Sequence, residues 1–80
     1  MIHLTKETKH TASEIVSLAS KFFGRGGLGL EEKTIKRDCI EFEGGGGYVS
    51  VVVVEEDDKR NVDIESREWE YHVKQFMEGI

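Results

Sequence analysis

The feature that most constrains the fold is a run of four consecutive glycines, Gly44, Gly45, Gly46 and Gly47, which we call the glycine run. Residues 39–43 before it and residues 48–56 after it are rich in apolar and β-branched side chains. Such side chains favour strands, and clustered glycines favour a turn. We therefore predict a β-hairpin with the glycine run as its loop and residues 48–56 as a long second strand.

A second hairpin is predicted directly after the first. Asp57 and Asp58 form its two-residue turn, and residues 59–65 alternate as its outgoing strand. Pairing outward from each turn brings the same side chains to one face, and a one-residue slip in either hairpin would destroy this agreement. The shared face comprises Ile40, Phe42, Val49, Val51, Val53, Val62 and Ile64. We predict a three-stranded antiparallel meander with the valine-rich strand in the middle.

A helix is predicted before the strands. Thr11 and Glu14 have the spacing of a capping box, in which each side chain bonds the backbone amide of the other residue. Apolar residues then recur at helical spacing, and Gly24 stands where a glycine commonly ends a helix. The predicted helix covers residues 12–23.

A second helix is predicted after the strands. Ser66 is a good N-cap, so we place the start of the helix there. Its apolar stripe has helical spacing and needs an apolar surface to cover. The stripe comprises Trp69, Val73, Phe76, Met77 and Ile80.

The predicted fold class is α+β, a two-layer sandwich of helix, three-stranded antiparallel meander and helix. Both helices are expected on one face of the sheet, because that face supplies the apolar surface that their stripes need. The 80 residues correspond to a single domain, residues 1–80. Residues 1–10 are polar except for alternating Ile2 and Leu4, and form either a flexible tail or a short edge strand.

This order of elements resembles the double-stranded RNA-binding domain in topology and length. That family grips phosphate with a basic cluster at the start of its last helix, whereas the matching segment here is Ser66-Arg67-Glu68-Trp69-Glu70. The resemblance therefore does not imply that this chain binds RNA. The net charge of −5, from 11 basic and 16 acidic residues, also repels phosphate groups. We expect no nucleic-acid partner.

The sequence predicts a cytoplasmic protein without a membrane partner. No apolar run approaches the ~18 residues that a membrane span needs. The first residues lack the apolar core of a signal peptide. The single cysteine, Cys39, cannot form an internal disulfide, which excludes a disulfide-stapled secreted domain.

The sequence gives little support for a catalytic, cofactor or metal site. Residues 24–29 match G-x-G-x-x-G, but they follow a helix and precede a strand, which is the reverse of a dinucleotide-binding turn. Glu68 and His72 have the spacing of two metal ligands on a helix, but two ligands do not make a site. No histidine is placed near Cys39 to act as its base. We expect no catalytic residue, no cofactor and no metal.

The leading functional interpretation concerns the sheet face opposite the predicted core. Its flanking strands are acidic and its centre is apolar, whereas a solvated antiparallel sheet usually has a more polar central strand. An apolar strip with a charged rim is typical of a protein contact. We interpret the chain as a small protein-interaction or self-associating module, with either a homodimer or another protein as its partner. The predicted interface residues are Cys39, Tyr48, Val52 and Val54.

The alternative is a small-molecule or anion-binding domain. The predicted topology places the starts of both helices at the sheet end that carries the glycine run. Helix N-termini and unobstructed backbone amides attract anions. The predicted ligand-binding residues are Gly44, Gly45, Gly46, Gly47 and Arg67.

Overall fold

The glycine hairpin is present in the computed structural model, which describes residues 1–80. It joins β3 (Cys39–Gly44) to the long strand β4 (Gly47–Glu56). Phe42 lies opposite Val49, as the sequence predicts. The turn itself is shorter than expected, because Gly44 and Gly47 pair with each other at the ends of the two strands. The register is unchanged by this difference.

The second hairpin is also confirmed. β4 pairs antiparallel with β5 (Lys59–Arg67), and Val51 lies opposite Ile64. The apolar side chains predicted for one face are all buried, and they are Ile40, Phe42, Val49, Val51, Val53, Val62 and Ile64. The three-stranded meander therefore forms the centre of the sheet.

The sheet nevertheless has five strands, not the three predicted, in the order β1-β5-β4-β3-β2. β1 (Ile2–Thr8) pairs antiparallel with β5, so the N-terminal segment is an edge strand. β2 (Glu31–Ile35) pairs with β3 at the other edge, with a register shift at Lys33. The sequence did not predict β2, because charged residues on an exposed edge hide the strand pattern.

Helix α1 (Ala12–Phe23) has the predicted bounds and the predicted cap. The Glu14 amide donates to Thr11 Oγ1 at 3.1 Å, and the Thr11 amide donates to Glu14 Oε1 at 2.9 Å. Both bonds satisfy amides that the first turn of a helix leaves free. Ile15, Ala19 and Phe23 are the buried residues of the helix.

Helix α2 (Glu70–Gly79) begins later than predicted, and Ser66 is not its N-cap. Ser66 is a fully buried strand residue that lies between Val49 and Ile2, since β1 offers β5 a second pairing partner. The chain leaves the sheet only at Glu68 and Trp69, which both have left-handed backbone conformations, with φ of 73° and 57°.

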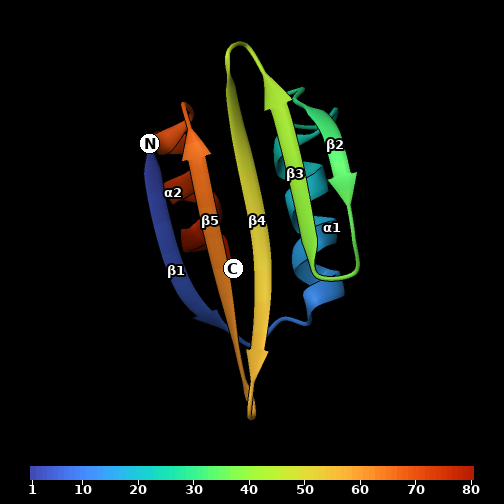
Figure 1. Ribbon diagram of the computed structural model, residues 1–80, viewed down its shortest axis with the longest axis vertical. Helices are drawn as coiled ribbons and strands as arrows, with labels where there is room; N and C mark the ends of the chain where they lie inside the picture. Colours follow the sequence, from blue (N-terminus) through green and yellow to red (C-terminus); the bar gives the residue numbers. More distant parts are fainter.

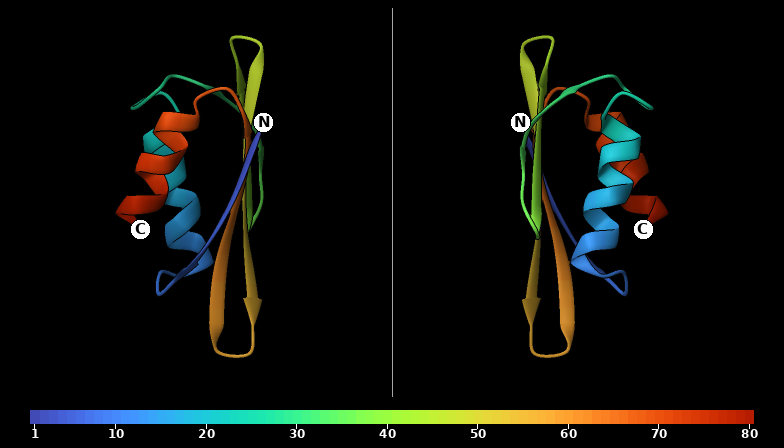
Figure 2. Two further views of the ribbon diagram at one scale, coloured as in Figure 1. Left: turned by 90° about the vertical axis from the view of Figure 1, so that its left-hand side faces the viewer. Right: turned by 90° about the vertical axis from the view of Figure 1, so that its right-hand side faces the viewer.

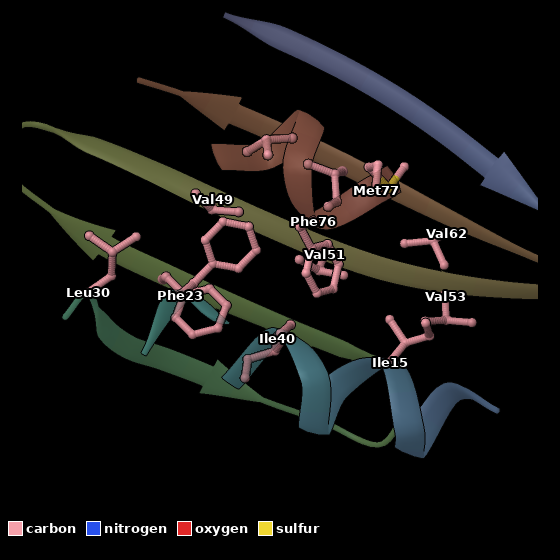
Figure 3. Close-up of a cluster of buried hydrophobic side chains, with 14 residues drawn as sticks. Ile15, Phe23, Leu30, Ile40, Val49, Val51, Val53, Val62, Phe76 and Met77 are labelled. Carbon is pink, nitrogen blue, oxygen red and sulfur yellow. The ribbon is translucent and has the colours of Figure 1, made fainter. Parts of the chain in front are cut away.

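The two helices cover one face of the sheet and leave the other bare (Figures 1 and 2). The core lies between these layers, where Phe23 of α1 and Phe76 of α2 contact each other at a ring-centroid distance of 5.2 Å above Val49 and Val51 (Figure 3). This arrangement confirms that both helices pack on one face. Neither helix is long and apolar enough to cross a membrane.

Candidate interaction surface

The bare side of the sheet, which we call the outer face, is the most extended surface that no helix covers (Figure 2). Alternation along each strand places every second side chain there. On the three central strands these residues are Cys39, Glu41 and Glu43 of β3, Tyr48, Ser50, Val52, Val54 and Glu56 of β4, and Lys59, Asn61, Asp63, Glu65 and Arg67 of β5.

Three of the four predicted interface residues lie together on the outer face. Cys39 and Val52 are directly paired across β3 and β4, and Val54 follows on the same face of β4. Cys39 and Val52 are half-buried, and Val54 is 38% exposed. We call these three residues the apolar patch. Tyr48 lies about 13 Å from Val52 along the strand, so it belongs to the same face but not to the patch.

Carboxylates line both sides of β4 on this face. Glu41 of β3 and Glu65 of β5 lie on either side of Ser50, and Asp63 lies opposite Val52. Glu43 lies opposite Tyr48 and is 4.0 Å from Lys33 Nζ. Glu41 and Glu65 form no ion pair. The apolar patch and Ser50 thus form the floor of a strip that has carboxylates on both sides at Ser50 and on the β5 side at Val52.

The edge strand β1 adds two side chains to one border. His3 Nε2 lies 2.9 Å from Asp63 Oδ1, and Thr5 donates to the same oxygen at 2.5 Å. The bond from Thr5, followed by the contact with His3, lowers the pKa of Asp63. Sequence reasoning missed both residues, although the alternation of Ile2 and Leu4 would have placed His3 and Thr5 on the opposite face once a strand was assumed.

Tyr48 is oriented by the acidic border. Its hydroxyl donates to Glu65 Oε1 at 3.2 Å. Burial, followed by the negative charge of Glu65, raises the pKa of Tyr48. The hydrogen bond from the phenol holds the Glu65 carboxylate beside β4.

A shallow hollow of about 160 Å³ lies in the outer face beside the apolar patch. Val52 is its one apolar lining residue, and the others are His3, Ser50, Asp63 and Glu65. An apolar floor below two carboxylates suits an aliphatic chain with a cationic or hydrogen-bond-donating end.

Backbone conformation and close packing explain the glycine run without a ligand. Gly45 and Gly46 have φ of 51° and 88° and form the tight turn. A methyl carbon at Gly47 would lie 2.9 Å from Glu68 Cβ and would overlap the Arg67 carbonyl oxygen. The run therefore provides a two-residue turn and room for the segment that leads into α2.

The helix starts expected to meet at the glycine run do not meet there. Because β2 lies between α1 and β3 in the chain, α1 begins at the opposite end of the sheet (Figure 1). There Arg60 Nη1 donates to the Lys9 carbonyl oxygen at 3.4 Å. Only α2 begins near the glycine run, and Glu70 occupies its first turn. Anion binding at the glycine run stays a prediction. It partly relied on the N-terminus of α1, which does not lie there.

The charges around the glycine run do not favour an anion either. The hollow beside it, about 380 Å³, is lined by the four glycines and by two carboxylates, Glu31 and Glu43. Arg67 does not line that hollow; it lies opposite Tyr48 on the outer face. A ligand in this hollow would meet negative charge first.

The largest hollow, about 800 Å³, lies between the end of α1 and β2. It is lined by two cations, Lys21 and Arg25, and by two carboxylates, Glu31 and Glu32, so it has no excess of either charge. The Ser20 hydroxyl donates to the Glu32 carboxylate in this hollow. No three histidine, cysteine or acidic side chains lie close enough together to hold a metal ion.

Comparison of the chain with protein-family models and with curated proteins finds no match. The surface of the molecule is therefore the basis for a functional assignment.

Proposed function

We propose that this protein is a small protein-interaction module that binds another protein chain through the outer face of its sheet. The supporting observation is the apolar patch of Cys39, Val52 and Val54, which lies on the central strands where no helix covers it. Apolar side chains bordered by charged ones are the usual arrangement of a specific protein contact.

The dimensions of the face agree with this role. A specific interface removes about 800 Å² of surface from each partner, roughly a sixth of the 5165 Å² that this chain exposes. The outer face is built on hydrogen-bonded strands, so little backbone freedom is lost when a partner binds. Two occupants fit the proposal: a second copy of the chain, or a different protein.

Crosslinking from the face tests the proposal. A photo-reactive residue is placed at Ser50, on the outer face, and at Ser17, exposed on α1, as the matched control. We expect discrete protein adducts from position 50 and none of the same mass from position 17, because only the first position lies beside the apolar patch.

Competition then identifies the contact. If the partner is a different protein, excess unlabelled protein should suppress the adducts from position 50; if it is a second copy, the unlabelled protein should itself be captured in them. Excess Val52→Glu protein should do neither. Circular dichroism must first show that Val52→Glu folds, which we expect because Val52 does not face the core. The proposal fails if positions 17 and 50 give the same adducts, or if Val52→Glu competes as well as the unchanged chain.

A further inference from the structure

We infer that the occupant of the outer face is a basic amphipathic helix of another protein, not a second copy of this chain. The inference rests on the proposed function and adds the chemistry of the partner. Charge is its starting point. Glu41 and Glu65 lie on either side of Ser50, and Asp63 lies beside Val52 of the apolar patch. The cations of β5 on this face, Arg67 and Lys59, lie at its two ends, opposite Tyr48 and Glu56.

A second copy meets like charges in both symmetric arrangements that place Ser50 of one copy over Ser50 of the other. A two-fold axis along β4 stacks β3 of one copy on β5 of the other, so Glu41 faces Glu65. An axis across β4 at Ser50 stacks each strand on its own counterpart, so Glu41 faces Glu41 and Glu65 faces Glu65. Opposed like charges disfavour a partner strongly, and a net charge of −5 on each copy adds to the repulsion.

A helix matches the strip in width and in length. Neighbouring strands lie about 4.8 Å apart, so the acidic borders on β3 and β5 are separated by about 10 Å, the diameter of a helix. From Tyr48 to Val54 the strip extends for about 20 Å, the length of a helix of about 14 residues. An apolar stripe on that helix would cover the apolar patch, and lysines or arginines beside the stripe would reach both borders.

The hollow beside Val52 provides a place for one such side chain. The aliphatic stem of a lysine or arginine would cover Val52, and its charged end would reach Asp63 and Glu65. His3, which lies 2.9 Å from Asp63 Oδ1, is the group that the incoming cation would displace. A carboxylate in the same place would meet two like charges.

The test uses two designed helical peptides of about 14 residues that share one leucine stripe. Lysines flank the stripe in the first peptide, and glutamates replace every lysine in the second. Each is titrated into the isotope-labelled protein. We expect the lysine peptide to shift the amide signals of Ser50, Val52 and Asp63, and to bind more weakly as salt is added. We expect no binding of the glutamate peptide.

Two matched charge variants test where on the protein the lysine peptide is attracted. Glu41→Gln with Glu65→Gln removes two charges from the borders of β4. Glu70→Gln with Glu78→Gln removes the same charge from α2, in the other layer. The first variant should bind the lysine peptide roughly fivefold more weakly, and the second should change binding by less than about twofold.

The other outcomes separate this inference from the proposed function. Equal binding of both peptides to the outer face would overturn the basic partner and keep the interaction surface. The same holds if neither peptide binds and light scattering shows a dimer that Val52→Glu abolishes. Equal weakening by the two charge variants would show attraction to net charge alone and would also overturn the inference. If neither peptide binds and the chain stays monomeric, the basic helix is wrong, and crosslinking from position 50 decides the proposed function.

Discussion

At the scale of single residues, Gly47 is a glycine whose neighbours leave no room for a methyl group. A methyl carbon there would overlap the Arg67 carbonyl oxygen and lie 2.9 Å from Glu68 Cβ, so the segment leading into α2 would have to move. We expect Gly47→Ala to lower the free energy of unfolding by about 1–3 kcal/mol, as other overpacking substitutions do. Urea denaturation followed by circular dichroism measures the change.

Gly79→Ala is the matched control for this prediction. Gly79 lies in α2, and a methyl carbon there would have no neighbour within 4 Å. Alanine favours the helix, so this variant should be neutral or more stable by up to about 1 kcal/mol. If the two alanine variants are equally stable, the close approach at Gly47 does not constrain the fold.

The sequence predicts some residue contacts of the outer face and misses others. The pairing of Cys39 with Val52 follows from the register of one hairpin and was predicted correctly. The contact of His3 with Asp63 joins residues 60 positions apart. It exists only because β1 pairs with β5, and no local pattern reports such a pairing. The acidic border was therefore predicted without the two side chains that hold Asp63.

At the scale of elements, the capping box makes α1 sensitive to pH. The hydrogen bond from the Thr11 backbone amide, followed by that with the Thr11 hydroxyl, lowers the pKa of Glu14. A carboxylate whose pKa falls on folding stabilises the fold above its unfolded pKa, and this stabilisation is lost as the pH falls through the folded value. The relevant window lies below the ordinary value of 4.5.

We therefore expect Glu14→Gln to be less stable than the unchanged chain at neutral pH. The difference should disappear in acid, where both side chains are neutral. Urea denaturation at a series of pH values measures it. Glu78→Gln is the control, because Glu78 makes no hydrogen bond or ion pair and its replacement should leave the pH dependence unchanged. A difference for Glu14→Gln that persists in acid would contradict the capping role of the carboxylate.

The elements that the sequence predicts best are those whose signals are local. α1 carries its own cap, and β3, β4 and β5 are linked by short turns. The start of α2 was misplaced because Ser66 has the chemistry of an N-cap, whereas β1 extends β5 through that position. β2 was missed because Glu31, Glu32 and Lys33 do not alternate in polarity as a half-buried strand does.

At the scale of the whole molecule, the two ends of the chain depend on each other. β1 pairs with β5 along its full length, so the first strand joins a sheet whose other strands come later in the sequence. Lys6 of β1 donates to the Met77 carbonyl oxygen of α2 at 2.6 Å. Leu4 packs against the buried core. The N-terminal segment therefore connects the sheet to the helical layer.

Removal of residues 1–9 should consequently weaken the entire fold, not only its edge. The truncated chain loses the half-buried Ile2 and Leu4 and exposes the border of β5 beside Val62 and Ile64. We expect the free energy of unfolding to fall by at least about 2 kcal/mol, since a fully buried aliphatic side chain contributes about 1.5–3 kcal/mol. Urea denaturation followed both by circular dichroism and by Trp69 fluorescence measures the loss.

A substitution at the opposite edge controls for damage to any edge strand. Ile35 ends β2 opposite the buried Ile40, yet it is 61% exposed. Ile35→Ala should therefore cost less than about 0.5 kcal/mol, the usual range for surface positions. Leu4→Ala should cost about 1–2 kcal/mol, less than the 2–5 kcal/mol of a fully buried leucine. If the truncated chain keeps the urea midpoint of the full chain, β1 does not contribute to the stability of the fold, and this prediction is wrong.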